Sequence, residues 1–344
     1  MSMPGKILAI QFKYLGDVVV ATPALRALKE HSAGAELHVL VPEEAAPLLA
    51  HAPWIDRVWG FPRRRGRMNL RAAWPVVKEL RAQRFDVSVD LAGNDRGALL
   101  SALIGARARI GMLAPNGSPL RRACYTRLVE TLDATRHESV RLWAVVAAMG
   151  IPFPDDLRMH VTPDPALQSA AQAYLAGVEV LCFINASQPK REWPLSRWAE
   201  FHAMASAHGV TIGFTGGHSA REKALLSELR ERIPQAIVLE PAEPLQLLIA
   251  SLAQLKGLIT TDSSPMHIAA ALGVPTISLF GPNAAQCWAP LGAKHAWLQG
   301  PPCSCSGQLN ACQARNPCIA AITPRQVHDA FLQLLTSARS KAPG

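Results

Sequence analysis

The chain has 344 residues, of which 49% are hydrophobic and 18% charged, and its formal net charge is +9 at pH 7. This composition excludes global disorder, and the length exceeds one ordinary core and fits two domains of about 150–170 residues. No apolar run approaches the roughly 20 residues that cross a bilayer. Met1 leads straight into an apolar run at Ile7 without a signal-peptide pattern, so we expect a cytoplasmic protein with its seven cysteines reduced.

Positive charge gathers in the first half of the chain. Residues 1–170 hold 22 Lys and Arg against 16 Asp and Glu, whereas residues 171–344 hold 13 against 10. The segments 57–71 and 96–128 each contain six arginines and no acid. Such segments attract anions, for example nucleic acid, lipid headgroups or a phosphorylated saccharide. A solvated basic face that keeps the protein soluble is the alternative, and the sequence leaves both open.

Strand and helix patterns alternate along the first half. The expected strands are 7–12, 37–41, 57–61 and 85–91, and the expected helices are 18–29, 43–51, 72–84, 97–104 and 138–149. The continuous apolar character of the last of these strands is typical of a strand that is buried on both faces. Four prolines between Ile151 and Pro165 interrupt the periodicity and predict a link between two domains.

The second half repeats this alternation. The expected strands are 180–184, 210–215, 236–239 and 255–260, and the expected helices are 196–208, 220–232, 245–252 and 324–338. Two successive α/β halves imply two parallel sheets that face each other across a cleft. We place the domains at 1–155 and 166–323, followed by a C-terminal helical segment, 324–344, whose position allows it to pack back on the first domain. The sequence has neither a glycine-rich dinucleotide fingerprint nor a phosphate loop, which argues against a nicotinamide oxidoreductase and a phosphate-loop NTPase.

The segment 260–282 predicts a strand end, a tight turn, a short helix and another strand. The small polar residues Asp262–Ser264 are typical helix caps, Pro265 suits a first helical turn, and Gly273 ends the helix. Helix N-termini at the carboxyl ends of strands are where α/β proteins bind phosphates. A carboxylate repels a phosphate placed against it, so Asp262 is better suited to a hydroxyl-bearing ligand or to holding the turn.

Two other loops also follow predicted strands. Gly16 leaves room for a ligand to approach the backbone, and the Asp17 carboxylate either projects into the crevice or complements the helix dipole. Lys190 and Arg191, just before Trp193, either neutralise a diphosphate or belong to a basic loop whose tryptophan packs on the core. The sequence does not decide between the members of either pair.

Histidine and cysteine residues raise the question of a metal. His267 lies in the first turn of its predicted helix, where a lone histidine is more often structural than catalytic. Cys303, Cys305, Cys312 and Cys318 lie within sixteen residues, but their spacing lacks the paired Cys-x-x-Cys elements of zinc sites. A structural loop with reduced thiols is the alternative to a metal site.

Together these motifs resemble glycosyltransferase family 9, the ADP-heptose:lipopolysaccharide heptosyltransferases of Gram-negative bacteria. The resemblance rests on residues 16–19 and 22–28, 90–91 with 94–96, the basic loop before Trp193-Pro194, and 262–267 through 280–282. It covers nearly the whole chain in the right order. The pattern is most similar to the branch of the family that adds a side heptose to the inner core.

The resemblance implies the GT-B architecture, with two Rossmann-like domains of which the first binds the acceptor and the second the donor. It implies inversion at the anomeric carbon, with no metal and no cofactor besides the donor substrate ADP-heptose. Asp17 matches the proposed general base of the family. Asp262, Ser263, Ser264 and His267 match its donor-binding turn, and Glu222 lies where the family often places an acid near the nucleotide ribose.

The chain departs from the family pattern at two positions. Ser264 stands where the family usually has glycine, so the approach of the backbone to the donor differs here. Arg191 occupies the position of the phosphate-binding lysine, with Lys190 one residue earlier, and either cation is able to serve. We assign acceptor binding to Gly16, Arg63, Arg64, Arg65, Asn94 and Arg96.

The expected partners are a nucleotide-sugar donor and an anionic, lipid-linked saccharide at the inner face of the inner membrane, with no nucleic acid. Three alternatives stay open at this point. One is a saccharide- or lipid-binding relative without catalysis, and another is a nucleotide-sugar enzyme of similar fold, such as an epimerase or a transferase of a different sugar. Binding of nucleic acid is suggested by charge alone, since no nucleic-acid module is visible.

Overall fold

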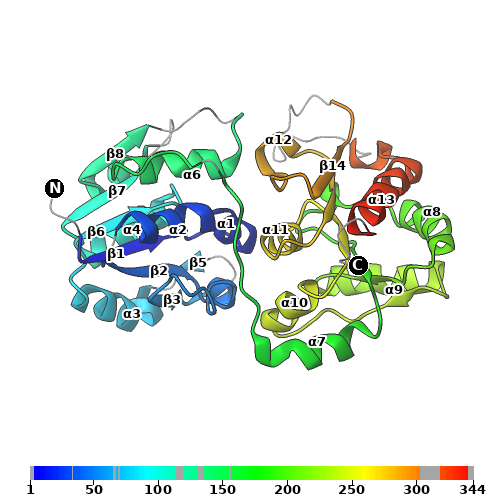
Figure 1. Cartoon of the computed structure of the whole chain (residues 1–344). Helices are drawn as coiled ribbons and strands as arrows, with labels where there is room; N and C mark the ends of the chain where they lie inside the picture. The colour runs from blue at the N-terminus through cyan, green and yellow to red at the C-terminus, as the bar shows by residue number, and fades with distance from the viewer. Residues whose placement is uncertain are drawn as a thin grey trace. The chain divides into compact units, whose positions relative to one another are not determined.

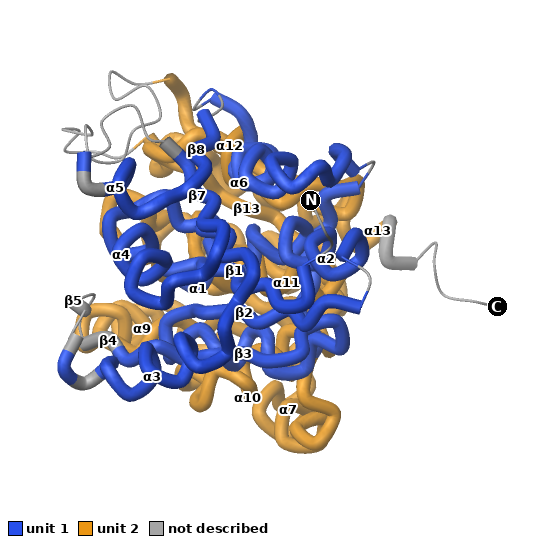
Figure 2. The backbone as a smooth tube through the Cα atoms, turned by 90° about the vertical axis from the view of Figure 1, so that its left-hand side faces the viewer, with its two compact units in different colours: residues 1–162 blue, residues 163–344 orange. Residues whose placement is uncertain are grey.

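The computed structural model describes residues 4–32, 34–64, 67–68, 70–113, 119–130, 133, 135–154, 156–302 and 318–339. The chain divides into two compact units, Met1–Thr162 and Pro163–Gly344, which Figure 2 shows in different colours. The division falls inside the proline-containing link that the sequence predicts. The two units are called the first and second domains below.

The first domain is built on a parallel sheet that has six strands within its described residues, in the order β3-β2-β1-β6-β7-β8. The strands are β1 (Lys6–Ile10), β2 (Glu36–Pro42), β3 (Arg57–Phe61), β6 (Val87–Asp90), β7 (Ala108–Leu113) and β8 (Arg127–Glu130). The helices are α1 (Leu15–Val20), α2 (Thr22–His31), α3 (Leu70–Ala82), α4 (Asp95–Ile104), α5 (Pro119–Cys124) and α6 (Glu138–Ala147). The short strands β4 (Arg63–Arg64) and β5 (Arg67–Met68) form a separate antiparallel pair.

Apolar residues cover both faces of this sheet, as its central parallel strands require. On one face Leu8 and Ile10 of β1 pack in a cluster with residues of α3 and α4, among them Val77 and Leu100. The other face carries helices α2 and α6, which contact each other. The strands follow one another from β8 at the top to β3 at the bottom of the first domain in Figure 1.

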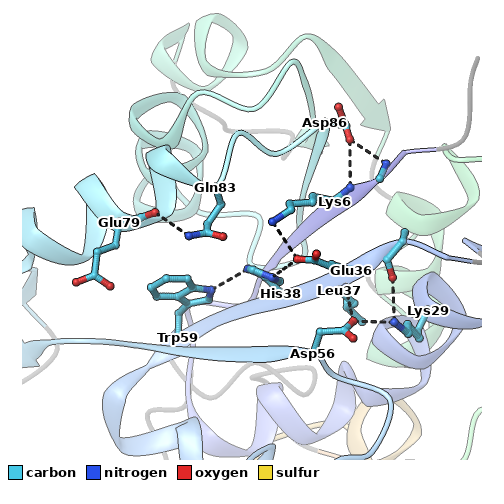
Figure 3. Close-up of polar contacts among 12 residues, drawn as sticks. Lys6, Lys29, Glu36, Leu37, His38, Asp56, Trp59, Glu79, Gln83 and Asp86 are labelled. Carbon is cyan, nitrogen blue, oxygen red and sulfur yellow. Dashed lines mark hydrogen bonds and ion pairs between the residues drawn. The ribbon is translucent and has the colours of Figure 1, made fainter.

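Ion pairs and hydrogen bonds occupy the amino-terminal end of the first sheet (Figure 3). Asp86 accepts hydrogen bonds from the backbone N–H groups of Gly5 and Lys6, at 2.8 and 3.1 Å. The Lys6 ammonium lies 3.0 Å from the Glu36 carboxylate, and the Trp59 indole N–H donates to Nδ1 of the buried His38 at 3.2 Å. These polar groups therefore link the strands at the amino-terminal end of the sheet. In α/β proteins ligands bind at the opposite end, where the strands have their carboxyl ends.

The second domain repeats the plan, with a parallel sheet of six strands among its described residues in the order β11-β10-β9-β12-β13-β14. The strands are β9 (Val180–Phe183), β10 (Ile212–Thr215), β11 (Ile237–Val238), β12 (Gly257–Thr261), β13 (Thr276–Phe280) and β14 (His295–Gln299). The helices are α7 (Gln168–Leu175), α8 (Leu195–Ala205), α9 (Ala220–Arg232), α10 (Leu245–Leu252), α11 (Ser264–Ala271), α12 (Ala285–Trp288) and α13 (Pro324–Arg339).

Helix α13 belongs to the core of the second domain. Its residues Val327, Phe331 and Leu334 are buried in the same cluster as Phe201 of α8 and Leu226 of α9. The rings of Phe331 and Phe201 meet edge to face, with centroids 5.8 Å apart. The apolar face of α13 is therefore buried within the second domain, and packing of the C-terminal segment 324–344 against the first domain stays a prediction.

Local sequence features explain where other expected elements differ. The helix expected over 18–29 is two helices, α1 and α2, with Ala21 between them and Pro23 in the first turn of α2, where its missing N–H costs no hydrogen bond. The helix expected over 43–51 is a 3-10 helix, Glu43–Leu48, that contains Pro47. Strands β7, β8 and β14 were not predicted, because polar residues leave each of them only a short apolar run: Arg109 lies within β7, and polar residues stand at both ends of β8 and β14.

Replacing Phe331 by alanine tests the place of α13. We expect the free energy of unfolding of the second domain to fall by about 3–5 kcal/mol, the usual cost of emptying a buried phenylalanine site. The exposed Asp329 on the same helix is the control, and Asp329→Ala should change it by less than about 0.5 kcal/mol. Equal effects of the two substitutions in urea denaturation would contradict the assignment.

Candidate functional site

In each sheet the strand that comes first in the chain lies in the middle, and the candidate residues lie near that strand. In the first domain the strand order reverses between β1 and β6, and in the second between β9 and β12. Connections from the two central strands leave toward opposite sides, which opens a crevice at their carboxyl ends where α/β proteins bind ligands. Asp17 follows β1, and the loop that contains Lys190 and Arg191 follows β9, so each lies at such a reversal.

Asp17 is the third residue of α1, and its side chain is 14% exposed. Its Oδ2 accepts the backbone N–H of Tyr14 at 3.3 Å, and its Oδ1 lies 3.7 Å from Nζ of Lys13. Burial raises the pKa of Asp17, the ammonium of Lys13 lowers it, and the carboxylate of Glu138 raises it, with a net shift upward. The carboxylate thus combines partial burial, a fixed orientation and a pKa raised toward the range useful for a base.

Tyr14 and Gly16 flank this carboxylate. The Tyr14 side chain is 73% exposed, an uncommon position for a large aromatic residue. Gly16 is buried in the first turn of α1. The arrangement presents an aromatic ring within one helical turn of the candidate base.

Asp90 ends β6 beside this point and is fully buried. Its Oδ1 accepts the backbone N–H of Ala92 at 2.8 Å, and its Oδ2 accepts the hydroxyl of the buried Tyr125. Burial, the largest effect, raises the pKa of Asp90 to about 6. A Cβ at Gly97 would lie 2.4 Å from the Asp90 carboxylate, so the first turn of α4 needs glycine there to pack against it.

The structure describes the side chains of only some of the residues assigned to acceptor binding. Asn94 caps α4, where its side-chain oxygen accepts the N–H groups of Arg96 and Gly97, and its amide donates to the Phe12 carbonyl at 3.3 Å. The Arg96 side chain is exposed. Arg63 and Arg64 form strand β4 and their side chains lie outside the described part of the structure, as does all of Arg65.

In the second domain, Arg191 and Asp262 meet across the strand-order reversal. Arg191 lies in a 3-10 turn, Pro189–Arg191, after β9, and Asp262 directly follows the neighbouring strand β12. Nη2 of Arg191 lies 2.8 Å from Oδ1 of Asp262 and also donates to its backbone carbonyl, and Asn283 donates to Oδ2 at 2.7 Å. Burial raises the pKa of Asp262, while Arg191 and Asn283 act in the opposite direction.

Further contacts hold the loop that carries Lys190. The Arg221 guanidinium reaches both oxygens of Glu192, at 2.7 and 2.6 Å, and donates to the Ala186 carbonyl at 2.7 Å. Trp193 is buried and donates its indole N–H to the Ile322 carbonyl at 2.9 Å. Both interpretations of this loop are therefore compatible with one geometry, because the tryptophan packs on the core while the basic turn lies at the strand-order reversal.

Helix α11 begins as its sequence predicts. Ser263 is the N-cap residue, Pro265 lies in the first turn, and Gly273 beyond the end has a φ of +76°. The Ser263 hydroxyl bonds the Thr260 hydroxyl at 3.0 Å rather than the helix backbone. Ser264 is half-buried and His267 is buried within this first turn.

Glu222 lies in the first turn of α9 and forms a capping box with Ser219. Its Oε2 accepts the backbone N–H and the hydroxyl of Ser219, at 3.1 and 2.5 Å. A Cβ at Gly217 would lie 2.5 Å from the Glu222 carboxyl carbon, and a Cβ at Gly216 would lie 1.8 Å from Oδ1 of Asn185. The two glycines let the loop after β10 close on these polar groups.

The structure brings Arg191 together with Asp262, and Asp17 together with Lys13 and Glu138. The sequence did not single out Lys13, Glu138, Asn283 or the Glu192–Arg221 pair. Asn283, which follows Phe280-Gly281-Pro282, was within reach, since it comes just after a strand end and the carboxyl ends of parallel strands share one edge. Glu138 lies far along the chain in a helix, where no local pattern marks it.

Most of the cysteine segment lies outside the residues that the structure describes. Cys303, Cys305 and Cys312 lie outside the described residues, and Cys318 begins a 3-10 helix, Cys318–Ala321. Within the described residues, no three His, Cys, Asp or Glu side chains gather closely enough to hold a metal ion. Searched over the same residues, the chain has no helix long and apolar enough to span a membrane.

The two domains, each an α/β unit with a six-stranded parallel sheet among its described residues, have the GT-B architecture. The model of glycosyltransferase family 9 (heptosyltransferase) matches residues 73–316, and the chain belongs to this family. It is therefore an enzyme of the heptosyltransferase kind.

Individual relatives agree with this assignment. The chain is 27% identical over 290 residues to lipopolysaccharide heptosyltransferase 3 of Escherichia coli, covering 81% of this chain and 84% of that protein. The structure of a family 9 glycosyltransferase from Veillonella parvula is similar with a TM-score of 0.85 and 22% identity, covering 97% and 98% of the two chains. The E. coli ADP-heptose LPS heptosyltransferase II is similar with a TM-score of 0.78 and 21% identity, covering 97% and 99%.

The raised pKa of Asp90 makes a prediction about stability and pH. The folded state favours the protonated carboxyl, so its contribution to stability is fully present below the unfolded pKa of about 3.8 and is lost as pH rises through about 6. Asp90→Asn cannot titrate. We expect the melting temperature of this variant, relative to the unaltered protein, to increase between pH 4 and pH 7. A constant or decreasing difference would contradict the raised pKa of Asp90.

Arg191→Met should destabilise the second domain by about 3–5 kcal/mol, because it leaves the Asp262 carboxylate buried without its cation. The double variant with Asp262→Asn should recover most of this loss, since the buried charge is then absent. Lys223→Met, on the exposed face of α9, also removes one positive charge and is the control, which should change stability little. Chemical denaturation measures all three, and additive losses in the double variant would contradict the pairing.

Proposed function

We propose that the chain transfers a heptose from ADP-heptose to the lipopolysaccharide inner core, as a side residue, with inversion and without a metal ion. The observation that carries the proposal is the Asp17 carboxylate at the strand-order reversal of the first domain. One of its oxygens is held by the Tyr14 N–H, and its pKa is raised by burial. Family membership supports the reaction class, and the name of E. coli heptosyltransferase II supports the donor.

In this mechanism Asp17 accepts the proton of the acceptor hydroxyl. The acceptor oxygen forms its bond to the anomeric carbon as the bond from that carbon to the diphosphate oxygen breaks. ADP leaves with the electron pair, and attack from the opposite face inverts the anomeric configuration. A general base is needed because a neutral hydroxyl is a weak nucleophile.

The departing diphosphate gains negative charge, and the second domain supplies groups that stabilise it. The Arg191 guanidinium is engaged by Asp262, so we assign it to holding the turn and assign the direct diphosphate contact to Lys190. The N-terminus of α11 at Ser263 and Ser264 adds backbone N–H groups and the positive end of a helix dipole. These groups support a reaction without a metal. His267 is assigned to the same donor turn, and Glu222 to the nucleotide ribose.

The acceptor site is assigned to the first domain. The exposed Tyr14 ring beside Asp17 offers a platform for a sugar, and Arg96, Arg63, Arg64 and Arg65 supply positive charge for an anionic saccharide. We extend this to contact with the anionic inner face of the inner membrane, where a lipid-linked acceptor is found, and to a cytoplasmic protein that attaches peripherally. Attraction of this kind is screened beyond about 10 Å at 0.1 M salt.

Asp17→Asn should lower the single-turnover rate of transfer by about 10²–10⁴, the usual contribution of a general base. Asparagine keeps the shape and still accepts the Tyr14 N–H, so ADP affinity and melting temperature should change little. An acid that only complements the helix dipole would behave in the opposite way, with a loss of about 0.3–1 kcal/mol in stability and nearly intact turnover. The second pattern would remove Asp17 from the mechanism.

ADP should bind to the protein in calorimetry, and Lys190→Met should weaken binding by about tenfold or more, because a hydrogen bond to a charged group contributes about 1.5–3 kcal/mol. Lys223→Met, on the exposed face of α9, removes the same charge and should leave ADP affinity unchanged. Tight binding of UDP with no binding of ADP would reject the donor assignment and favour another nucleotide-sugar enzyme of this fold.

A further inference from the structure

Glu138 is a buried carboxylate that the mechanism above does not use. It is the first residue of α6, and its side chain is 4% exposed. Its Oε1 lies 3.1 Å from Nζ of Lys13, and its Oε2 accepts a hydrogen bond from Nη1 of Arg141 at 2.6 Å. A carboxylate this deeply buried is retained only with such partners, since an unpaired one would cost several kcal/mol.

Lys13 stands between two carboxylates. Its ammonium lies 3.1 Å from Glu138 but 3.7 Å from Oδ1 of Asp17, so the closer contact is made with the residue that has no assigned role. The other oxygen of Asp17 is held by the Tyr14 N–H. Oδ1 is therefore the oxygen that accepts the proton in the proposed reaction. The position of the Lys13 ammonium determines how accessible Oδ1 is to the acceptor hydroxyl.

The charges around Asp17 oppose one another. Lys13 lowers the pKa of Asp17 and Glu138 raises it, while burial raises it most. Lys13 also lowers the pKa of Asp90, and Arg141 faces Glu138 from the next turn of the same helix. Moving the Lys13 ammonium toward or away from Asp17 changes the basicity of that carboxylate without altering its backbone contacts.

We propose that Glu138 is a positioning residue for the transfer reaction: it draws the Lys13 ammonium away from Asp17, so that Oδ1 stays near a positive charge but open to the acceptor hydroxyl. Lys13 stabilises the ionised base, and Glu138 prevents a tight ion pair that would make the base weaker and cover it. This inference rests on the proposed function of Asp17 and goes beyond it, since it assigns roles to two further residues.

The pH profile of the single-turnover transfer rate tests the inference. In Glu138→Gln the Lys13 ammonium turns to Asp17, so the acid limb of the profile should move down by about 1 pH unit and the plateau rate should fall. In Lys13→Met the positive charge is lost, so the acid limb should move up by about 1 pH unit. If these residues had only a structural role, the substitutions would lower the rate at every pH and leave the acid limb at the same pH.

Glu36→Gln is the matched control, because Glu36 also pairs with a lysine, Lys6, at 3.0 Å, at the amino-terminal end of the same sheet. This variant should leave the limb unmoved. Limbs that stay in place in both test variants, or move in the same direction, would overturn the inference. The proposed function fails separately if Asp17→Asn retains turnover, and Lys13→Met carries the test should Glu138→Gln fail to fold.

Discussion

The strand order reverses in the middle of each sheet, and this reversal determines where the polar residues of the two candidate sites lie. A parallel sheet needs crossover connections, and these are right-handed, so strands added to either side of the first one send their helices to opposite faces. The carboxyl ends of the two central strands are left uncovered at that point. Asp17 and Asp90 lie there in the first domain, and Arg191 and Asp262 in the second, because each of them ends or follows one of the central strands.

Burying polar or charged groups at such a point costs free energy unless they are paired, and the two domains pair them differently. The second domain pairs Asp262 with Arg191 and Asn283, which fixes the turn before α11. The first domain places one ammonium, that of Lys13, between two carboxylates. The ion pair in the second domain favours a rigid turn before α11. The arrangement in the first domain leaves a carboxylate that is able to change its protonation state.

Much of this follows from local sequence. The alternation of apolar runs predicts the two α/β domains, and Ser263, Pro265 and Gly273 predict α11, because caps, prolines and glycines act on their immediate neighbours. The edge strands β8 and β14 were missed, since their residues are only half-buried or exposed and carry no continuous apolar run. Glu138 was missed for a different reason. Its partner Lys13 is 125 residues away, and only the fold brings such a pair together. The packing of α13 in the second domain depends on which apolar face lacks cover, which the helix sequence alone does not contain.

The most direct test of the account is a transfer reaction with ADP-heptose labelled in the sugar, a truncated lipopolysaccharide core as acceptor, and a metal chelator present throughout. We expect that label passes into the core saccharide, that one ADP is released for each heptose transferred, and that the chelator does not change the rate. Absence of label in the core while ADP-heptose binds, or transfer that appears only when a divalent metal is restored, would contradict it.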